Sequence, residues 1–298
     1  MLFTETHGSR KAFAKDPAVV RLNNTYYLYY STYAIEDDKE KLMIGISRSI
    51  DMENWEFVSL FPLTQDCEKN GVGAPGAFMK DGVVHLFYQT YGNGVKDSIC
   101  HAVSNDGVNF EKDTTNPIFS PSKSWCCGRA IDADVVEFKD KLYLYFATRD
   151  FEMRIQKIGC AYAPITSDYS RNTWQEAVAA PVLFPEYDWE GACTEAPATL
   201  AKDGKIYMFY GGAYNCSPQV IGYAVSSDGI RFEKPLSVPF LRNGQKGDWN
   251  ESESGHPYIF EDTDGKIYLF YQGSPDGGKT WYLTKKELYF DGEKPILL

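Results

Sequence analysis

The sequence predicts an all-β fold, a five-bladed β-propeller with about four antiparallel strands in each blade. The first observation is that Phe, Trp and Tyr make up 15% of the 298 residues. They gather in short runs bounded by Asp, Gly, Asn and Lys, a pattern typical of strands and hairpin turns. The second is that five runs can be aligned, beginning at residues 16, 74, 132, 195 and 255, with steps of 58, 58, 63 and 60 residues.

Each aligned run has the pattern of a β-hairpin. A small or acidic residue, usually with a Pro, opens a first strand, and a tight turn leads into an aromatic second strand. Three of the turns contain Asp-Gly, whose residues tolerate positive φ. An alternating strand, a polar turn and a short strand follow, which completes four strands per repeat. The hairpins span 16–32, 74–90, 132–148, 195–212 and 255–273, and the following elements span 42–58, 99–112, 157–174, 220–234 and 280–292.

Units that cannot bury their own faces must pack against their neighbours, which favours a propeller and one domain over residues 1–298. The competing interpretation is an all-β sandwich whose hairpins are similar by accident. Helical signal is sparse, and we expect at most a turn or two of helix at 36–43 and at 168–177.

The net charge of −11 argues against nucleic-acid and membrane-surface partners, because both need clustered positive charge. No apolar stretch reaches the roughly 18 residues of a membrane-spanning helix. The first residues lack the basic start and apolar run of a signal peptide, so we expect a cytoplasmic protein, or a secreted one if a leader has been removed. The seven Cys include no Cys-x-x-Cys pair, and we expect reduced thiols.

The first strands of the five blades all run in the same direction, so their starting residues should meet at one mouth of the central channel. Acidic residues stand at three of these starts, Asp16, Asp132 and Glu195, and His256 stands at a fourth. Carboxyl groups crowded into one hollow repel one another, which raises the pKa of at least one. Two carboxyls with separated pKa values are what hydrolysis of a glycosidic bond requires.

At these residues the chain resembles glycoside hydrolase family 43 and its five-bladed relatives. The resemblance lies in KDPAVV, RAIDADVVEF, TEAPATL and GHP, in their order and in their blade positions. It implies that Asp16 is the general base, that Glu195 is the general acid, and that Asp132 orients this acid and raises its pKa. It also implies that His256 is a channel residue beside a structural calcium ion or a water, with no required cofactor.

The sequence departs from the family pattern at several positions. Asp134 lies two residues after Asp132 and rivals it for the same role, and Ala133 stands where a Pro is usual. The second blade has Gly73-Ala74-Pro75 without the Trp platform of many relatives, and the fifth lacks the usual His-x-Arg. KDPAVV matches family 43 better than the related fructan-cleaving family. We therefore expect inversion, with the carboxyls of Asp16 and Glu195 about 6.5–9.5 Å apart rather than the roughly 5–5.5 Å of retention.

Further candidates for substrate binding lie near the blade starts. The indoles of Trp125 and Trp189 would either stack on a sugar or cover the core. Arg129 and Arg149 would bind a substrate hydroxyl or carboxylate, or pair with the surplus acids, and we favour pairing. Tyr33 and Tyr214 follow second strands and should face the mouth, whereas Glu251 and Glu253 read as part of a solvated loop.

The expected function is an inverting glycosidase, acting on oligosaccharides of the xylan or arabinan type as a β-xylosidase or α-L-arabinofuranosidase. One alternative is a phosphate-dependent glycoside phosphorylase on a related propeller, with Arg129 and Arg149 as the candidate phosphate ligands. Another is a non-catalytic sugar-binding propeller. The remaining His residues have no metal-ligand spacing around them, so we expect no catalytic metal.

Overall fold

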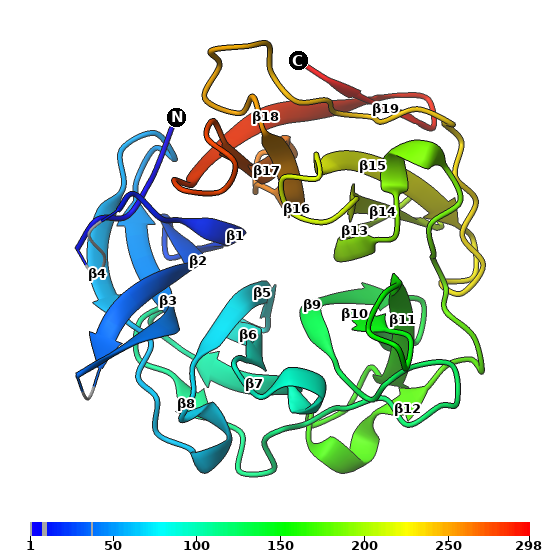
Figure 1. Cartoon of the computed structure of the whole chain (residues 1–298). Helices are drawn as coiled ribbons and strands as arrows, with labels where there is room; N and C mark the ends of the chain where they lie inside the picture. The colour runs from blue at the N-terminus through cyan, green and yellow to red at the C-terminus, as the bar shows by residue number, and fades with distance from the viewer. Residues whose placement is uncertain (1, 8–10, 37) are drawn as a thin grey trace.

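The structure, a computed structural model, describes residues 2–7, 11–36 and 38–298. Five antiparallel sheets stand around a central axis (Figure 1). The innermost strands β1 (Lys15–Leu22), β5 (Val72–Lys80), β9 (Ile131–Phe138), β13 (Thr194–Lys202) and β16 (Glu253–Glu261) contact one another in a closed ring. The predicted five-bladed propeller is therefore confirmed.

Each blade is a meander that runs outward from its inner strand. Blade one continues with β2 (Thr25–Glu36), β3 (Lys39–Ser49) and β4 (Glu56–Leu60), and blade two with β6 (Val83–Thr90), β7 (Ile99–Ser104) and β8 (Glu111–Lys112). Blade three has β10 (Lys141–Arg149), β11 (Gln156–Pro164) and β12 (Gln175–Glu176). Blade four has β14 (Lys205–Gly212) and β15 (Val220–Ser226). Blade five has β17 (Ile267–Ser274), β18 (Tyr282–Asp291) and β19 (Lys294–Leu297). The 3-10 turns are η1 (Asp66–Glu68), η2 (Gly94–Lys96), η3 (Arg171–Thr173) and η4 (Asp188–Glu190).

Two details differ from the expectation. The sheet of blade four has three strands, and where a fourth would lie there is a single bridge between Val225 and Glu233. The helical turn expected at 36–43 is wrong for the residues described there, because 36 and 39–43 belong to β2 and β3. At 168–177 the chain makes the single 3-10 turn η3. Within the described ranges, no helix is long and apolar enough to cross a membrane.

The apolar core lies between neighbouring blades. Aromatic residues of the second strands, such as Tyr29, Phe87 and Phe209, are almost completely buried there. Tyr145 in β10 is likewise buried, and its hydroxyl donates to the Gly229 carbonyl of the next blade at 2.7 Å. The aromatic runs thus become second strands because their rings fill the space between blades, where burial stabilises the fold most.

Every inner strand carries a bulge at the residue that precedes the Pro position. The pairing register shifts there in all five blades, and the residue at the bulge has a positive φ. A positive φ is energetically unfavourable for a non-glycine residue. Because it recurs at the same position in all five blades, it is a regular feature of the channel mouth. The five residues are Asp16 (φ 55°), Ala74 (43°), Asp132 (53°), Ala196 (51°) and His256 (44°).

The N-terminal segment closes the ring. In blades two, three and four a residue of the third strand forms an isolated bridge with the segment that leads to the next blade, as Ile99 does with Phe119. In blade five Leu283 forms this bridge with Phe3, whose N–H donates to the Leu283 carbonyl at 2.8 Å. Because the partner comes from the opposite end of the chain, blades one and five are joined by backbone hydrogen bonds.

Candidate active site

The predicted site residues Asp16, Asp132, Glu195 and His256 line one cavity of about 200 Å³. It opens where the inner strands begin, at the mouth expected from the sequence. Tyr33 and Arg129 line it as well. The rest of its wall consists of Phe13, Lys15, Leu42, Ala74, Gln89, Tyr91, Ile131, Arg149, Gln156, Tyr214 and Asn215.

The Asp16 carboxylate is held between an imidazole and an ammonium group. Its Oδ1 lies 3.0 Å from Nδ1 of His256 and 3.9 Å from Nζ of Lys15. Its backbone N–H donates to Oε1 of Gln272, at 3.0 Å, in the neighbouring blade. Burial alone would raise the pKa of Asp16, but the charges of His256 and Lys15 outweigh burial and lower it. Asp16 is therefore kept as a carboxylate, the form that accepts a proton.

Amide side chains surround the Glu195 carboxyl group. Gln156 donates to Oε2, Gln219 donates to Oε1 at 2.5 Å, and Nδ2 of Asn215 lies 3.3 Å from the same oxygen. The orientation of both glutamines is fixed in turn, because Oε1 of Gln156 accepts from Arg149 and Oε1 of Gln219 accepts from the His256 N–H. These contacts leave Glu195 little rotational freedom.

The Asp132 carboxyl group has a contrasting environment. Its backbone N–H donates to Gln89 at 2.9 Å, but no hydrogen bond reaches its side chain from the part of the chain that the structure describes. Burial raises its pKa to about 7, with the Glu195 and Asp16 charges adding to the rise and His256 opposing it. The cluster of three carboxyls therefore retains a proton close to neutral pH, as the sequence led us to expect.

Asp134, the rival of Asp132, lies outside the cavity. Its Oδ2 accepts hydrogen bonds from the Thr199 backbone, at 2.8 Å, and hydroxyl, so it ties the inner strands of blades three and four together. The sequence placed Asp132 and Asp134 on one face of a regular strand. The bulge at Asp132 breaks that alternation, and only Asp132 lines the cavity.

The structure adds a polar network that the sequence analysis missed. Nζ of Lys15 donates to Asn215 at 2.7 Å, and Gln272 donates to Glu253 at 2.6 Å. Burial lowers the pKa of Lys15, but the carboxylates around it, first Asp16 and then Glu253, raise it. Glu253, expected in a solvated loop, is fully buried. One signal was available: Gln89 and Gln272 occupy matching places in FYQT and FYQG at the ends of their second strands.

The two tryptophans proposed as sugar platforms are not among the residues that line the cavity. Trp125 lies over Gly159, and a Cβ added to this glycine would lie 3.0 Å from the Trp125 indole. Trp189 packs against Gly212 and donates from its indole to the Ser237 carbonyl at 3.2 Å. Both indoles therefore pack on strands of their blades, and Trp189 covers part of the core, which is the structural alternative that the sequence left open. Tyr33 does reach the cavity, with its ring 4.7 Å from that of Phe13.

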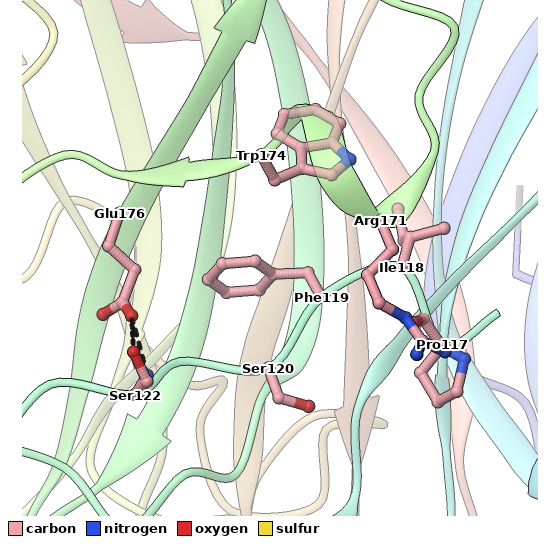
Figure 2. A pocket seen from close by; sticks show the side chains of 8 residues that line it. All are labelled: Pro117, Ile118, Phe119, Ser120, Ser122, Arg171, Trp174 and Glu176. Carbon is pink, nitrogen blue, oxygen red and sulfur yellow. Dashed lines mark hydrogen bonds between the residues drawn. The ribbon is translucent and has the colours of Figure 1, made fainter. Parts of the chain in front are cut away.

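A larger cavity of about 500 Å³ lies at the outer edges of blades two and three (Figure 2). Its wall contains Phe119, Trp174 and Arg171, and one carboxylate, Glu176, which accepts hydrogen bonds from the backbone and hydroxyl of Ser122. Among the described residues that line this cavity there is no pair of carboxyls, so it lacks the two groups that hydrolysis of a glycosidic bond requires.

Comparison with known proteins agrees with this geometry. A family model described as glycosyl hydrolases family 43 matches residues 10–291. A thermostable family-43 glycoside hydrolase is 24% identical, with a TM-score of 0.76 over 99% of this chain and 95% of that one. An endo-1,4-β-xylanase from Bacteroides thetaiotaomicron is 22% identical, with a TM-score of 0.72 over 96% and 94% of the two chains. An exo-1,5-α-L-arabinanase from a bovine ruminal metagenomic library is 16% identical, with a TM-score of 0.71 over 97% of each.

These structural likenesses show the same fold at low sequence identity, and the family model covers nearly the whole chain. Three carboxyl groups from three blades line one cavity at the channel mouth. Together these findings establish that the chain belongs to glycosyl hydrolase family 43 and is a glycosidase.

Proposed function

We propose that this enzyme is an inverting glycosidase that removes a terminal pentose, a β-xylosyl or α-L-arabinofuranosyl residue, from plant-type oligosaccharides. The observation that carries the proposal is that Asp16, Asp132 and Glu195 line one small cavity. Structures of this fold include proteins named as a xylanase and an arabinanase, which supports a pentose substrate. The cavity of about 200 Å³ is smaller than a typical ligand pocket of roughly 300–1,000 Å³, which favours one terminal sugar over a long chain.

In the proposed reaction Asp16 acts as the general base. It removes a proton from a water molecule while this water attacks the anomeric carbon on the face opposite the leaving group. His256 and Lys15, beside its Oδ1, favour the carboxylate that this step needs. His256 also fixes the direction in which the Asp16 oxygens point, which makes it a positioning residue in this scheme.

Glu195 acts as the general acid and gives its proton to the oxygen of the departing group. Gln156 and Gln219 hold its two oxygens in place, which supports a fixed approach to the glycosidic bond. Asp132 contributes a nearby like charge that helps the cluster keep a proton at neutral pH. Once the bond has broken, both protons are accounted for: the one from water is on Asp16 and the one from Glu195 is on the leaving alcohol.

A panel of aryl glycosides tests the proposal. Wild-type enzyme should release the phenol from the β-xyloside or the α-L-arabinofuranoside, with the sugar product first appearing in the inverted anomeric form. Glu195→Gln should lose about 10²–10⁴-fold of the activity on substrates with poor leaving groups, and much less with an activated phenol, because the activated phenol needs no protonation. Equal loss on both kinds of substrate would contradict the acid role, and retention of configuration would contradict inversion.

The same panel distinguishes the other functions that the sequence left open. Activity that requires inorganic phosphate and yields a sugar phosphate would identify a phosphorylase. Arg129 and Arg149, which line the cavity, would be the phosphate ligands of such an enzyme. Sugar binding with no release of product would identify a non-catalytic propeller.

No step of the proposed mechanism uses a calcium ion beside His256. Calcium prefers six to eight oxygen ligands. The Nδ1 atom of His256 is engaged with Asp16, and in the described ranges no three His, Cys, Asp or Glu side chains gather in a way that could hold a metal ion. The donor set around His256 therefore does not fit this ion.

A further inference from the structure

Two arginines stand side by side in the wall of the active-site cavity. Arg129 precedes β9 and Arg149 ends β10, the two strands of one hairpin. Ile131 pairs with Ala147, and each arginine lies two residues further towards the mouth. The two backbones remain in contact there, since the Cys127 N–H donates to the Arg149 carbonyl at 2.9 Å. The hairpin thus presents two guanidinium groups to the same hollow.

Neutral groups provide the hydrogen bonds of Arg149. Its Nε donates to Oε1 of Gln156 at 2.7 Å, one Nη lies 3.5 Å from the Met153 carbonyl, and its guanidinium is 5.0 Å from the ring centroid of Tyr214. No carboxylate lies within ion-pair distance of it among the residues that the structure describes. The expectation that Arg149 would pair with a surplus acid is therefore wrong.

Arg129 forms an ion pair with Asp97, as the sequence led us to expect. Its Nε lies 3.7 Å from Oδ2 of Asp97, which is too long for a hydrogen bond, and this buried nitrogen has no other hydrogen-bond partner. The Asn93 N–H binds the other oxygen of Asp97, Oδ1, at 3.0 Å. The Nη groups of Arg129 make no hydrogen bond to the residues that the structure describes, so they remain available to a ligand in the cavity.

The chemistry of these two side chains favours an anion. The guanidinium fork matches the two oxygens of a carboxylate or of a phosphate, and it is weakly hydrated and therefore suited to a partly buried site. Two like charges held together on one hairpin repel each other, and a neutral hydroxyl would leave that repulsion in place. An oxyanion offsets both charges.

We propose that Arg129 and Arg149 form an oxyanion subsite in the active-site cavity, which binds either the carboxylate of an acidic sugar at or next to the cleaved bond or inorganic phosphate. This inference rests on the proposed function, because it names a chemical class of ligand for the same cavity. It makes the two arginines determinants of specificity. Neither exchanges a proton with the substrate, although Arg149 also fixes Gln156, which holds Glu195.

Calorimetric titration tests the subsite without turnover. The ligands are glucuronate and galacturonate, each beside its neutral counterpart, glucose or galactose, and inorganic phosphate. The wild type should bind at least one of the anions about tenfold or more tightly than the neutral sugars. Preference for a uronate identifies the source as an acidic sugar, and preference for phosphate alone identifies it as phosphate. Equal binding of anions and neutral sugars, or no binding of any anion at millimolar concentration, would overturn the proposal.

Variants assign the preference to the two arginines. Arg129→Gln and Arg149→Gln should each remove most of the preference for the anion, with a smaller change in the weak binding of neutral sugars. Arg149→Lys keeps the charge but loses the fork, so it should retain an intermediate preference, and it guards against a folding defect. Arg231→Gln, on the exposed edge of blade four, is the matched control and should behave like the wild type. A preference that survives both glutamine variants would refute the assignment.

The two proposals fail in different experiments. If no aryl glycoside is hydrolysed, the proposed function is lost, whereas the binding preference can still be measured. If the anion preference is absent while xylosides or arabinofuranosides are cleaved, only the subsite is refuted.

Discussion

At the scale of single residues, the three carboxyl groups of the cavity differ through their neighbours. Asp16 is beside an imidazole and an ammonium group, Glu195 is bound by amides, and the Asp132 side chain receives no hydrogen bond from the described residues. Burial is common to all three, since none is more than 8% exposed. The partners therefore decide which carboxyl carries charge and which carries a proton, and this predicts how activity depends on pH.

The first prediction concerns that pH dependence. The pKa of Asp16 is lowered, so the base stays ionised into the acid range, while the pKa of Asp132 is raised to about 7. Activity should thus fall on the alkaline side as the cluster loses its last acid proton near pH 7. Asp132→Asn removes the carboxyl whose pKa is raised to about 7, so the cluster no longer keeps a proton up to that pH. The alkaline limb of the kcat/KM profile should move down by about one pH unit or more, and kcat should fall.

Asp134→Asn is the matched control for this measurement. Asp134 lies two residues away on the same strand, and burial also raises its pKa to about 7, but it binds Thr199 and does not line the cavity. Its amide variant should leave the pH profile in place. An unmoved profile in Asp132→Asn, or an equal shift in both variants, would count against like-charge control of the acid.

At the scale of elements, the sequence predicted the inner strands well and their local geometry poorly. Period, turn chemistry and aromatic runs are local signals, so they identified every inner hairpin. The bulges are different, because their positive φ falls on Asp, Ala and His residues that share no local sequence signal. The bulge residue carries the acid in blades one and three, whereas in blade four Glu195 lies one residue before it. Contacts such as that between Lys15 and Asn215, which are 200 residues apart, have no sequence pattern at all.

The second prediction concerns the close approach of two inner strands. Gly76 of β5 faces β9, and a Cβ built on it would lie 2.0 Å from the backbone oxygen of Ala133. Gly76→Ala must therefore push Ala133 away, and Asp132 precedes it directly. We expect a loss of about 1–3 kcal/mol in the free energy of unfolding from overpacking. We also expect kcat/KM to fall about tenfold or more, because catalytic groups tolerate little displacement.

Gly82→Ala separates this effect from general strain. Gly82 lies in the turn between β5 and β6 with a φ of +80°, and an added Cβ would meet nothing within 4 Å. This variant should lose about 1 kcal/mol of stability through its backbone and keep its kcat/KM. Denaturant unfolding and steady-state kinetics on both variants decide the matter. A fully active Gly76→Ala enzyme would contradict the idea that this contact sets the position of Asp132.

At the scale of the whole molecule, the ring joins chain ends that the sequence does not mark as neighbours. The repeat predicts five blades but gives no partner for the edge of the last one. The structure provides that partner through Phe3. The resulting seam between blades one and five also passes through the active site, because Asp16 belongs to the first blade and His256 to the fifth, and their side chains lie 3.0 Å apart.

The last prediction follows from this seam. Phe3→Pro removes the N–H that donates to Leu283 and so leaves a carbonyl without its partner, which should cost about 1–3 kcal/mol in the free energy of unfolding. Because the same seam holds His256 against Asp16, kcat should fall along with the thermal unfolding temperature. Leu2→Pro is the control, since Leu2 is 54% exposed and makes no hydrogen bond within the described residues. If Phe3→Pro unfolds at the same temperature as Leu2→Pro, the N-terminal bridge is not what closes the ring. If it unfolds earlier but keeps full activity, the seam stabilises the fold without setting the geometry of the base.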